Sequence, residues 1–194
     1  MHTTTKFIVV TFALAILPIL AKAQTSYHVG AKPEMTLYGT STLHDWTMTA
    51  HAFTATAQFT VTTDNQLTAI SSLTVDVTVH NLKSDHSGMD DNAYEALKAD
   101  HFKTIVFHLT SASVTSSGGN KYQIAAAGNL TIAGVTHAET LHATGVVNAD
   151  GSISVSGSVP IKLSDFNIER PSFMLGTMKV GDAMTLNYSL IFVK

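Results

Sequence analysis

Leu73-Thr-Val-Asp-Val-Thr-Val-His80 places four hydrophobic side chains on one face of an extended chain and four polar side chains on the other. Side chains of a β-strand alternate between the two faces of a sheet, so this segment predicts a strand with one dry and one wet face. Strands of this kind are typical of antiparallel sheets that cover a core on one side. The alternation also fixes the register, because a shift of one residue would expose the whole hydrophobic set.

Comparable runs occupy most of the chain on both sides of this segment. They are 35–39, 47–62, 102–115, 122–132, 135–147, 153–163 and 184–192. Turn-forming residues separate them at Asp64-Asn65, at 116–120, at Gly134 and at 148–151. Long strands in regular succession predict a meander. We therefore expect an all-β fold, an antiparallel up-and-down barrel of about eight strands, because closure removes exposed strand edges. A sandwich is the alternative that periodicity alone leaves open.

One segment, residues 89–99, departs from the strand pattern. Met89, Ala93 and Leu97 recur at a spacing of four, which places them on one face of a helix. Asp90 and Asp91 fall in the first turn, where acidic side chains complement the helix dipole, which favours a helix start over a catalytic carboxylate pair. The segment predicts one short helix that caps an open end of the barrel.

The N-terminus has the features of a signal peptide. Lys6 precedes an apolar run at 7–20, and Ala21-Lys22-Ala23 forms a small-residue cleavage site. The run is shorter than the roughly 20 residues that a membrane-spanning helix needs, so we do not expect an integral membrane protein. The sequence predicts a signal peptide at 1–23, a single domain at 24–194, and export to the periplasm or cell envelope.

Charge and cysteine content exclude several classes of protein. The full chain carries 11 basic and 14 acidic residues, and removal of Lys6 and Lys22 with the signal peptide makes its net charge more negative. An acidic surface argues against nucleic acid as a partner. The chain contains no cysteine, which excludes thiolate catalysis and cysteine-ligated metal centres and favours a bacterial periplasm over a eukaryotic extracellular setting.

The segment Gly39-Thr-Ser-Thr-Leu-His-Asp-Trp46 is the most distinctive polar stretch. In the structural interpretation, Trp46 plugs a barrel end with its indole N–H paired, while His44 or Asp45 satisfies turn amides. In the functional interpretation, His44 and Trp46 contact a ligand headgroup. The nine histidines outside the signal peptide suggest a metal site as a further hypothesis. None of them shows the i, i+4 spacing of a zinc-binding helix. Ser84-Asp85-His86 resembles a catalytic triad in composition only, because adjacent residues cannot form the relay.

Several motifs together resemble the YceI-like family of exported bacterial proteins. They are Gly39–Trp46 as quoted above, Asn81-Leu-Lys-Ser84, the helix segment with Asp100, Phe102-Lys-Thr-Ile-Val-Phe-His-Leu-Thr110, Gly128-Asn-Leu-Thr-Ile-Ala-Gly-Val-Thr136, Leu163-Ser-Asp-Phe166 and Met178-Lys-Val-Gly-Asp182. The resemblance implies a lipocalin-like barrel that binds a polyisoprenoid chain. The chain departs from the common family pattern H-L-x-S-x-D-F-F-D before the helix, which bears on the identity of the ligand.

The small inward candidates Ala55, Ala57, Ala126, Gly128 and Gly157 predict an under-filled apolar interior, which is a binding cavity. With the resemblance, this predicts a carrier for a long-chain isoprenoid or another lipid, with no catalytic residue, metal or cofactor. The expected lining is Phe53, Val75, Val77, Phe107 and Leu130, with His44, Trp46 and Tyr94 near the mouth. A metal-binding envelope protein or hydrolase using His44 and Asp45 and an interaction protein with a filled barrel stay as alternatives. Pairing of two barrels as a homodimer also stays open.

Overall fold

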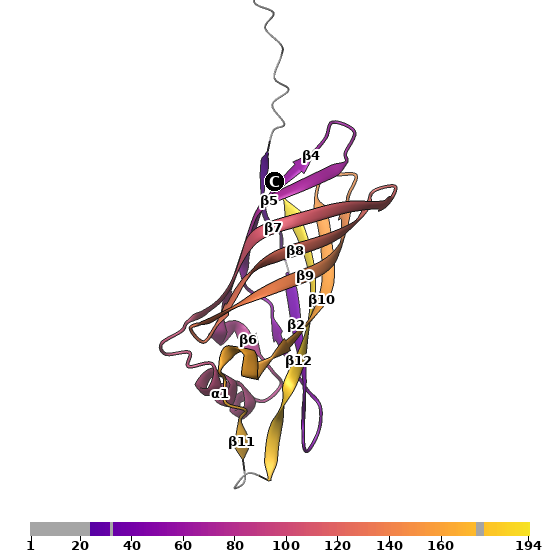
Figure 1. Ribbon diagram of the computed structural model, residues 1–194. Helices are drawn as coiled ribbons and strands as arrows, with labels where there is room; N and C mark the ends of the chain where they lie inside the picture. The colour runs from indigo at the N-terminus through magenta and orange to yellow at the C-terminus, as the bar shows by residue number, and fades with distance from the viewer. Residues whose placement is uncertain (1–23, 32, 174–176) are drawn as a thin grey trace, which may run out of the picture.

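The structure is a computed structural model that describes residues 24–194 except 32 and 174–176 (Figure 1). The expected signal peptide lies outside the described residues. The elements are β1 (Thr25–Val29), β2 (Glu34–Ser41), β3 (Trp46–Ala50), β4 (Thr54–Val61), β5 (Leu67–Thr78), η1 (Val79–Asn81), β6 (Leu82–Lys83), α1 (Ser87–Ala96), β7 (Thr104–Gly118), β8 (Lys121–Ile132), β9 (Val135–Val147), β10 (Ile153–Lys162), η2 (Leu163–Phe166), β11 (Ser172–Phe173) and β12 (Met178–Val193).

Eight strands close into an antiparallel barrel, which confirms the predicted fold. The ring runs β1-β4-β5-β7-β8-β9-β10-β12 and returns to β1 through the pair His28 and Val193. From β4 to β12, strands that are neighbours in the ring follow one another along the chain, apart from the short β6 and β11. The barrel is therefore a meander, and its closure leaves no free edge where β1 meets β12.

The expected single strand at 47–62 is wrong, because the chain forms two strands there. Residues 51–53 interrupt it, so that β3 pairs with β2 and β6 while β4 pairs with β1 and β5. The hydrophobic alternation continues through the break, so the break could not be predicted from the alternation. Strand β1, which closes the ring, lies before the first strand that we expected.

The segment Leu73–Thr78 forms the second half of β5 and alternates as predicted. Leu73, Val75 and Val77 face the barrel interior, and His80, expected at the strand end, lies in η1 instead. The hairpin between β8 and β9 turns at Ala133 and Gly134, both with positive φ (48° and 79°). Two successive residues with positive φ form the turn that matches the twist of a β-hairpin.

Helix α1 starts and ends earlier than expected and lies at one end of the barrel (Figure 1). Met89, Ala93 and Leu97 pack against the core, as the predicted apolar stripe requires. Leu163, expected to end the strand at 153–163, instead begins the 3-10 helix η2, whose Leu163 and Phe166 are buried. The barrel thus has one end covered by α1 and η2.

Candidate functional site

The barrel interior contains a cavity of about 170 Å³, which we call the barrel cavity. Side chains from every strand of the ring except β1 line it, and Tyr188 is the one lining residue with a side-chain oxygen or nitrogen. The Tyr188 hydroxyl donates a hydrogen bond to the carbonyl of His142 (3.2 Å), and burial raises the pKa of Tyr188 to about 12. The hydroxyl is therefore neutral and already paired, so the cavity offers a ligand only hydrocarbon contacts.

Small residues explain this cavity only in part. Ala126 and Ala143 line it, as an under-filled interior requires. A side chain at Gly128 would collide with the ring of Phe107, and one at Gly157 would collide with the hydroxyl of Tyr188. The space that these two glycines leave is therefore filled by aromatic neighbours, contrary to our expectation for them.

A second cavity of about 350 Å³ lies beneath α1, and we call it the α1-end cavity. It shares six lining residues with the barrel cavity: Leu37, Leu82, Leu97, Leu163, Ile168 and Met184. Its polar lining residues are Ser41, His44, Trp46, His86, Asn92 and Lys179, with no Asp or Glu among the lining. The two cavities thus adjoin to form one site, and the α1-end cavity is also bounded mainly by apolar atoms. Its polar end is the outer rim, where the exposed His44, His86 and Lys179 lie. The volume of the α1-end cavity falls in the size range of small-molecule sites.

The loop between β2 and β3 positions His44 and Trp46 at this end. The Ser41 hydroxyl accepts hydrogen bonds from the backbone N–H groups of Leu43 (3.2 Å) and His44 (3.1 Å), which closes the loop. Trp46 lies opposite Gly39 in the β2–β3 ladder, and its ring occupies the space where a side chain at Gly39 would be. The indole Nε1 donates to the Thr40 carbonyl (3.0 Å), so the tryptophan N–H is paired, as the structural interpretation requires.

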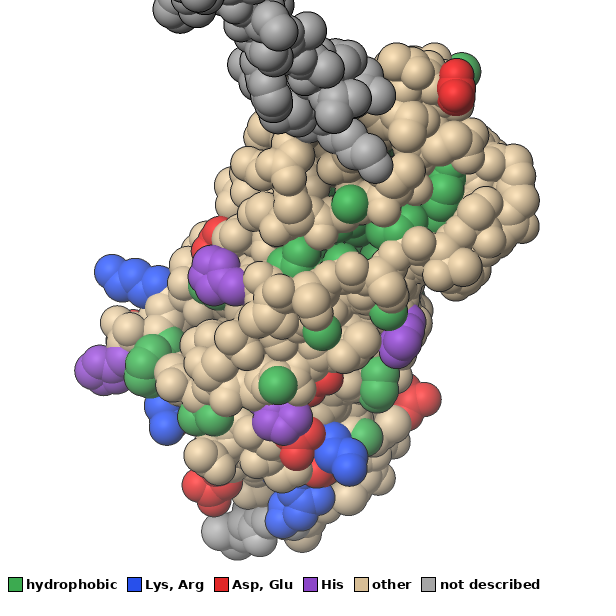
Figure 2. All heavy atoms as spheres, turned by 45° about the horizontal axis from the view of Figure 1, so that its top comes forward, with side chains coloured by type: hydrophobic (Ala, Val, Ile, Leu, Met, Phe, Trp, Pro, Cys, Tyr) green, Lys and Arg blue, Asp and Glu red, His purple; other side chains and the backbone are tan. Residues whose placement is uncertain are grey.

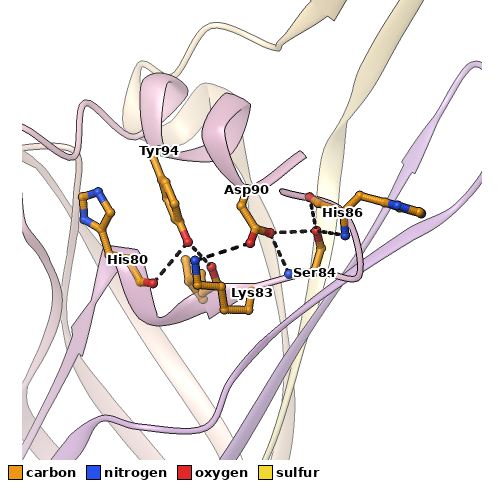
Figure 3. Close-up of polar contacts among 7 residues, drawn as sticks. His80, Lys83, Ser84, His86, Asp90 and Tyr94 are labelled. Atoms are coloured by element: carbon orange, nitrogen blue, oxygen red, sulfur yellow. Dashed lines mark hydrogen bonds and ion pairs between the residues drawn. The ribbon is translucent and has the colours of Figure 1, made fainter. Parts of the chain in front are cut away.

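A polar cluster fixes the start of α1 to the end of β6 (Figure 3). Asp90 accepts hydrogen bonds from the backbone N–H and hydroxyl of Ser84 (both 2.7 Å) and lies 3.5 Å from the Lys83 ammonium. Burial raises the pKa of Asp90, but the Ser84 hydrogen bonds and the Lys83 charge outweigh it and leave the pKa below its ordinary value. Ser84 thus donates two hydrogen bonds to Asp90. The cluster stabilises α1 over the α1-end cavity.

The structure brings six of the eight expected site residues to the cavities. Val75, Val77, Phe107 and Leu130 line the barrel cavity, and His44 and Trp46 line the α1-end cavity.

Two of the expected site residues line neither cavity. Phe53 lies in the break between β3 and β4 and packs against the core without lining either cavity. Tyr94 also lines neither cavity, and its hydroxyl donates to the carbonyls of His80 (3.1 Å) and Leu82 (2.8 Å). Sequence reasoning missed His86 and Lys179, since neither lies in a run whose face could be assigned.

Within residues 24–194, leaving out the four undescribed positions, no three His, Asp or Glu side chains gather in a way that could hold a metal ion. The same part of the chain contains no helix that is both long and apolar enough to cross a membrane.

Comparisons with known proteins agree with this fold. No curated protein matches the sequence. Burkholderia cenocepacia BcnA shares 20% identity at a TM-score of 0.64 over 82% of this chain and 95% of that chain. A polyisoprenoid-binding domain from Saccharophagus degradans shares 10% identity at a TM-score of 0.65 over 86% and 97%. Campylobacter jejuni YCEI shares 17% identity at a TM-score of 0.53 over 96% and 94%. The model of the YceI-like domain matches residues 23–192, and the chain therefore belongs to the YceI-like family.

Proposed function

We propose that this protein binds and carries a long apolar lipid of the polyisoprenoid type. The lining of the barrel cavity carries the proposal, because hydrocarbon side chains and one neutral, paired tyrosine surround the space. Burial of each CH₂ group of a ligand contributes about 0.8 kcal/mol, so a long chain binds such an interior without any polar contact. The solved Saccharophagus degradans domain, described as polyisoprenoid-binding, supports the same class of ligand.

The polar residues of the α1-end cavity give the bound lipid a direction. The apolar chain lies in the barrel cavity, and the terminal group lies beneath α1 near His44, His86 and Lys179. Met48, Met89 and Met178 also line this end, and their flexible side chains adapt to terminal groups of different shape. A hydrocarbon lining has no group that donates, accepts or attacks, so the barrel cavity is suited to binding and not to catalysis.

The proposed place of action is the periplasm or cell envelope. The signal peptide expected at residues 1–23 supports it, and so does the absence of cysteine from the sequence. A carrier in this compartment would shield an apolar chain from water between membranes or enzymes.

Native mass spectrometry of the freshly purified protein, followed by solvent extraction, tests the proposal. We expect a co-purifying lipid of one or a few masses. A stoichiometric metal without lipid would support the metal-binding alternative. The absence of both lipid and metal would support a filled barrel. Both outcomes would refute the carrier proposal.

Variants on β7 link the lipid to the cavity. Phe107→Asp places a carboxylate in the hydrocarbon lining and should abolish lipid content, because an unpaired buried charge is strongly unfavourable. His108→Asp introduces the same residue at the exposed neighbouring position and should keep the lipid. Ala126→Leu fills the cavity without a charge and should also reduce lipid content, which covers the case in which Phe107→Asp fails to fold. Full lipid content in both cavity variants would contradict the proposed location.

A further inference from the structure

The barrel wall is open along one seam, between the halves of β5 and β7 that lie away from α1. The two strands pair only over Thr74–Thr78 and Thr104–His108. Beyond these pairs, residues 67–73 of β5 pair with β4 alone and residues 109–118 of β7 pair with β8 alone. Figure 2, with this end turned forward, shows hydrophobic side chains at the bottom of a slot in a largely polar and backbone surface.

β-Bulges explain why the two strands separate at this point. The register of β5 against β4 shifts at Ser71, and that of β7 against β8 shifts at Thr110, each within three residues of the last β5–β7 pair. A bulge adds a residue to one strand, bends that strand and ends regular pairing. The Thr110 hydroxyl donates to the Ala127 carbonyl (3.0 Å), which anchors the bulge of β7 to β8. The separation is thus built into both strands.

The slot leads into the barrel cavity and lacks the cover that closes a comparable seam. Ile70 and Leu73, on the separated half of β5, line the cavity. Strands β9 and β10 also separate, beyond Ala143 and Gly157, but there η2 fills the seam with buried Phe166, whose ring lies 5.9 Å from that of His137. Among the described residues, every helix lies towards the α1 end, so none covers the slot between β5 and β7 (Figure 1).

The rim of the slot is uncharged. Residues 65–75 and 104–120 contain no Lys, Arg, Asp or Glu, and hydroxyl side chains make up much of their outer face. Desolvation of a charged side chain is far more unfavourable than desolvation of a neutral polar one. An apolar chain that passes this rim desolvates no charged side chain.

We infer that this slot is a lateral portal through which an apolar chain enters and leaves the barrel cavity sideways from a lipid surface, instead of threading from the α1 end. The inference rests on the proposed function. In a side portal, successive carbons pass from a lipid surface into the barrel cavity with little exposure to water. A passage beneath α1 would instead draw the whole chain past His44, His86 and Lys179.

A crosslink across the slot tests the portal, because the chain contains no cysteine of its own. Ser72→Cys and Ser111→Cys introduce thiols at exposed positions on the two separated strands, just beyond the Thr74–His108 pair. A bismaleimide with an internal disulfide joins them and is cleaved by reductant. The matched control joins Thr115→Cys to Gln123→Cys, two exposed partners across the fully paired β7–β8 seam.

The readout is the transfer of tritiated geranylgeraniol between phosphatidylcholine vesicles and the protein. We expect the crosslink across the slot to slow uptake and release equally, by about tenfold or more, with equilibrium occupancy unchanged, because a blocked route alters both rates and not their ratio. Reductive cleavage should restore both rates, and the control crosslink should change neither. Normal occupancy with unchanged rates in the crosslinked protein would refute the portal alone. Failure of the unmodified protein to take up the probe would refute the proposed function and the portal with it.

Discussion

Ala126→Leu adds three carbon atoms at a position that is 4% exposed and lines the barrel cavity. If the cavity is open space, as the structure has it, these atoms leave water on folding and fill a void. At about 0.8 kcal/mol per carbon, the variant should be more stable than the wild-type protein by about 2 kcal/mol. Part of this gain is lost where the added side chain is not in its preferred rotamer, so we expect about 1–2 kcal/mol.

Ala57→Leu is the matched control, because Ala57 is 2% exposed but lines neither cavity. The same three carbons there enter a packed region of the core. Overpacking of this kind is unfavourable by about 1–3 kcal/mol. The two variants thus have identical chemistry and opposite predicted signs.

Urea unfolding of lipid-free protein, followed by far-UV circular dichroism, measures the difference. With a slope of about 2 kcal/mol/M, the midpoint should rise by about 0.5–1 M for Ala126→Leu and fall by a similar amount for Ala57→Leu. The lipid must be extracted first, because a ligand that binds the native state raises the midpoint of the wild-type protein by itself. A decrease for both variants would show that the barrel interior is packed solid and would refute the reasoning behind the carrier proposal.

Two further predictions concern titratable groups. Asp90→Asn should reduce stability by about 1–3 kcal/mol at neutral pH, because it weakens the hydrogen bonds from Ser84. Folding lowers the pKa of Asp90, so its contribution to the free energy of unfolding is present above about pH 4 and is lost as the pH falls. The urea midpoints of the two proteins should therefore converge in acid. A constant difference between the midpoints down to pH 2 would contradict this. Burial raises the pKa of Tyr188 from 10.0 to about 12, so its contribution is present below pH 10 and is lost as the pH rises through 12. The wild-type protein should therefore lose more stability than Tyr188→Phe over that interval, and absorbance of phenolate at 295 nm should show one tyrosine that ionises last.

The strand pattern was predictable where one face of a strand is dry and the other wet. Val75 and Val77 were placed inward from alternation alone, and both line the barrel cavity. The same rule failed at residues 51–53, because the alternation continues through a stretch in which the backbone leaves the ladder. Side-chain period reports which way residues point and carries no information about the partner strand, so it could not show that β3 and β4 belong to different parts of the sheet.

The polar end of the site was less predictable, for a physical reason. Ser84 and Asp90 are six residues apart, and their contact depends on how β6 leads into α1. Lys179 and His86 both line the α1-end cavity because β12 and the start of α1 converge there. Contacts between distant segments depend on tertiary geometry and could not be predicted. His44 and Trp46 could be predicted as site residues because they lie two residues apart, where one short loop places both at the same end of the barrel.

The combination of an unreactive interior and an open seam resolves a difficulty for any carrier of long hydrocarbons. Withdrawal of ten CH₂ groups into water at once would be unfavourable by about 8 kcal/mol, which would make release through a narrow end very slow. A lateral opening with an uncharged rim lets each carbon exchange protein contacts for lipid contacts in turn, so the barrier depends on the few groups in transit and not on the length of the chain. Tight binding and rapid exchange with a lipid surface are then compatible, and the bulges at Ser71 and Thr110 are the features of the sequence that make them so.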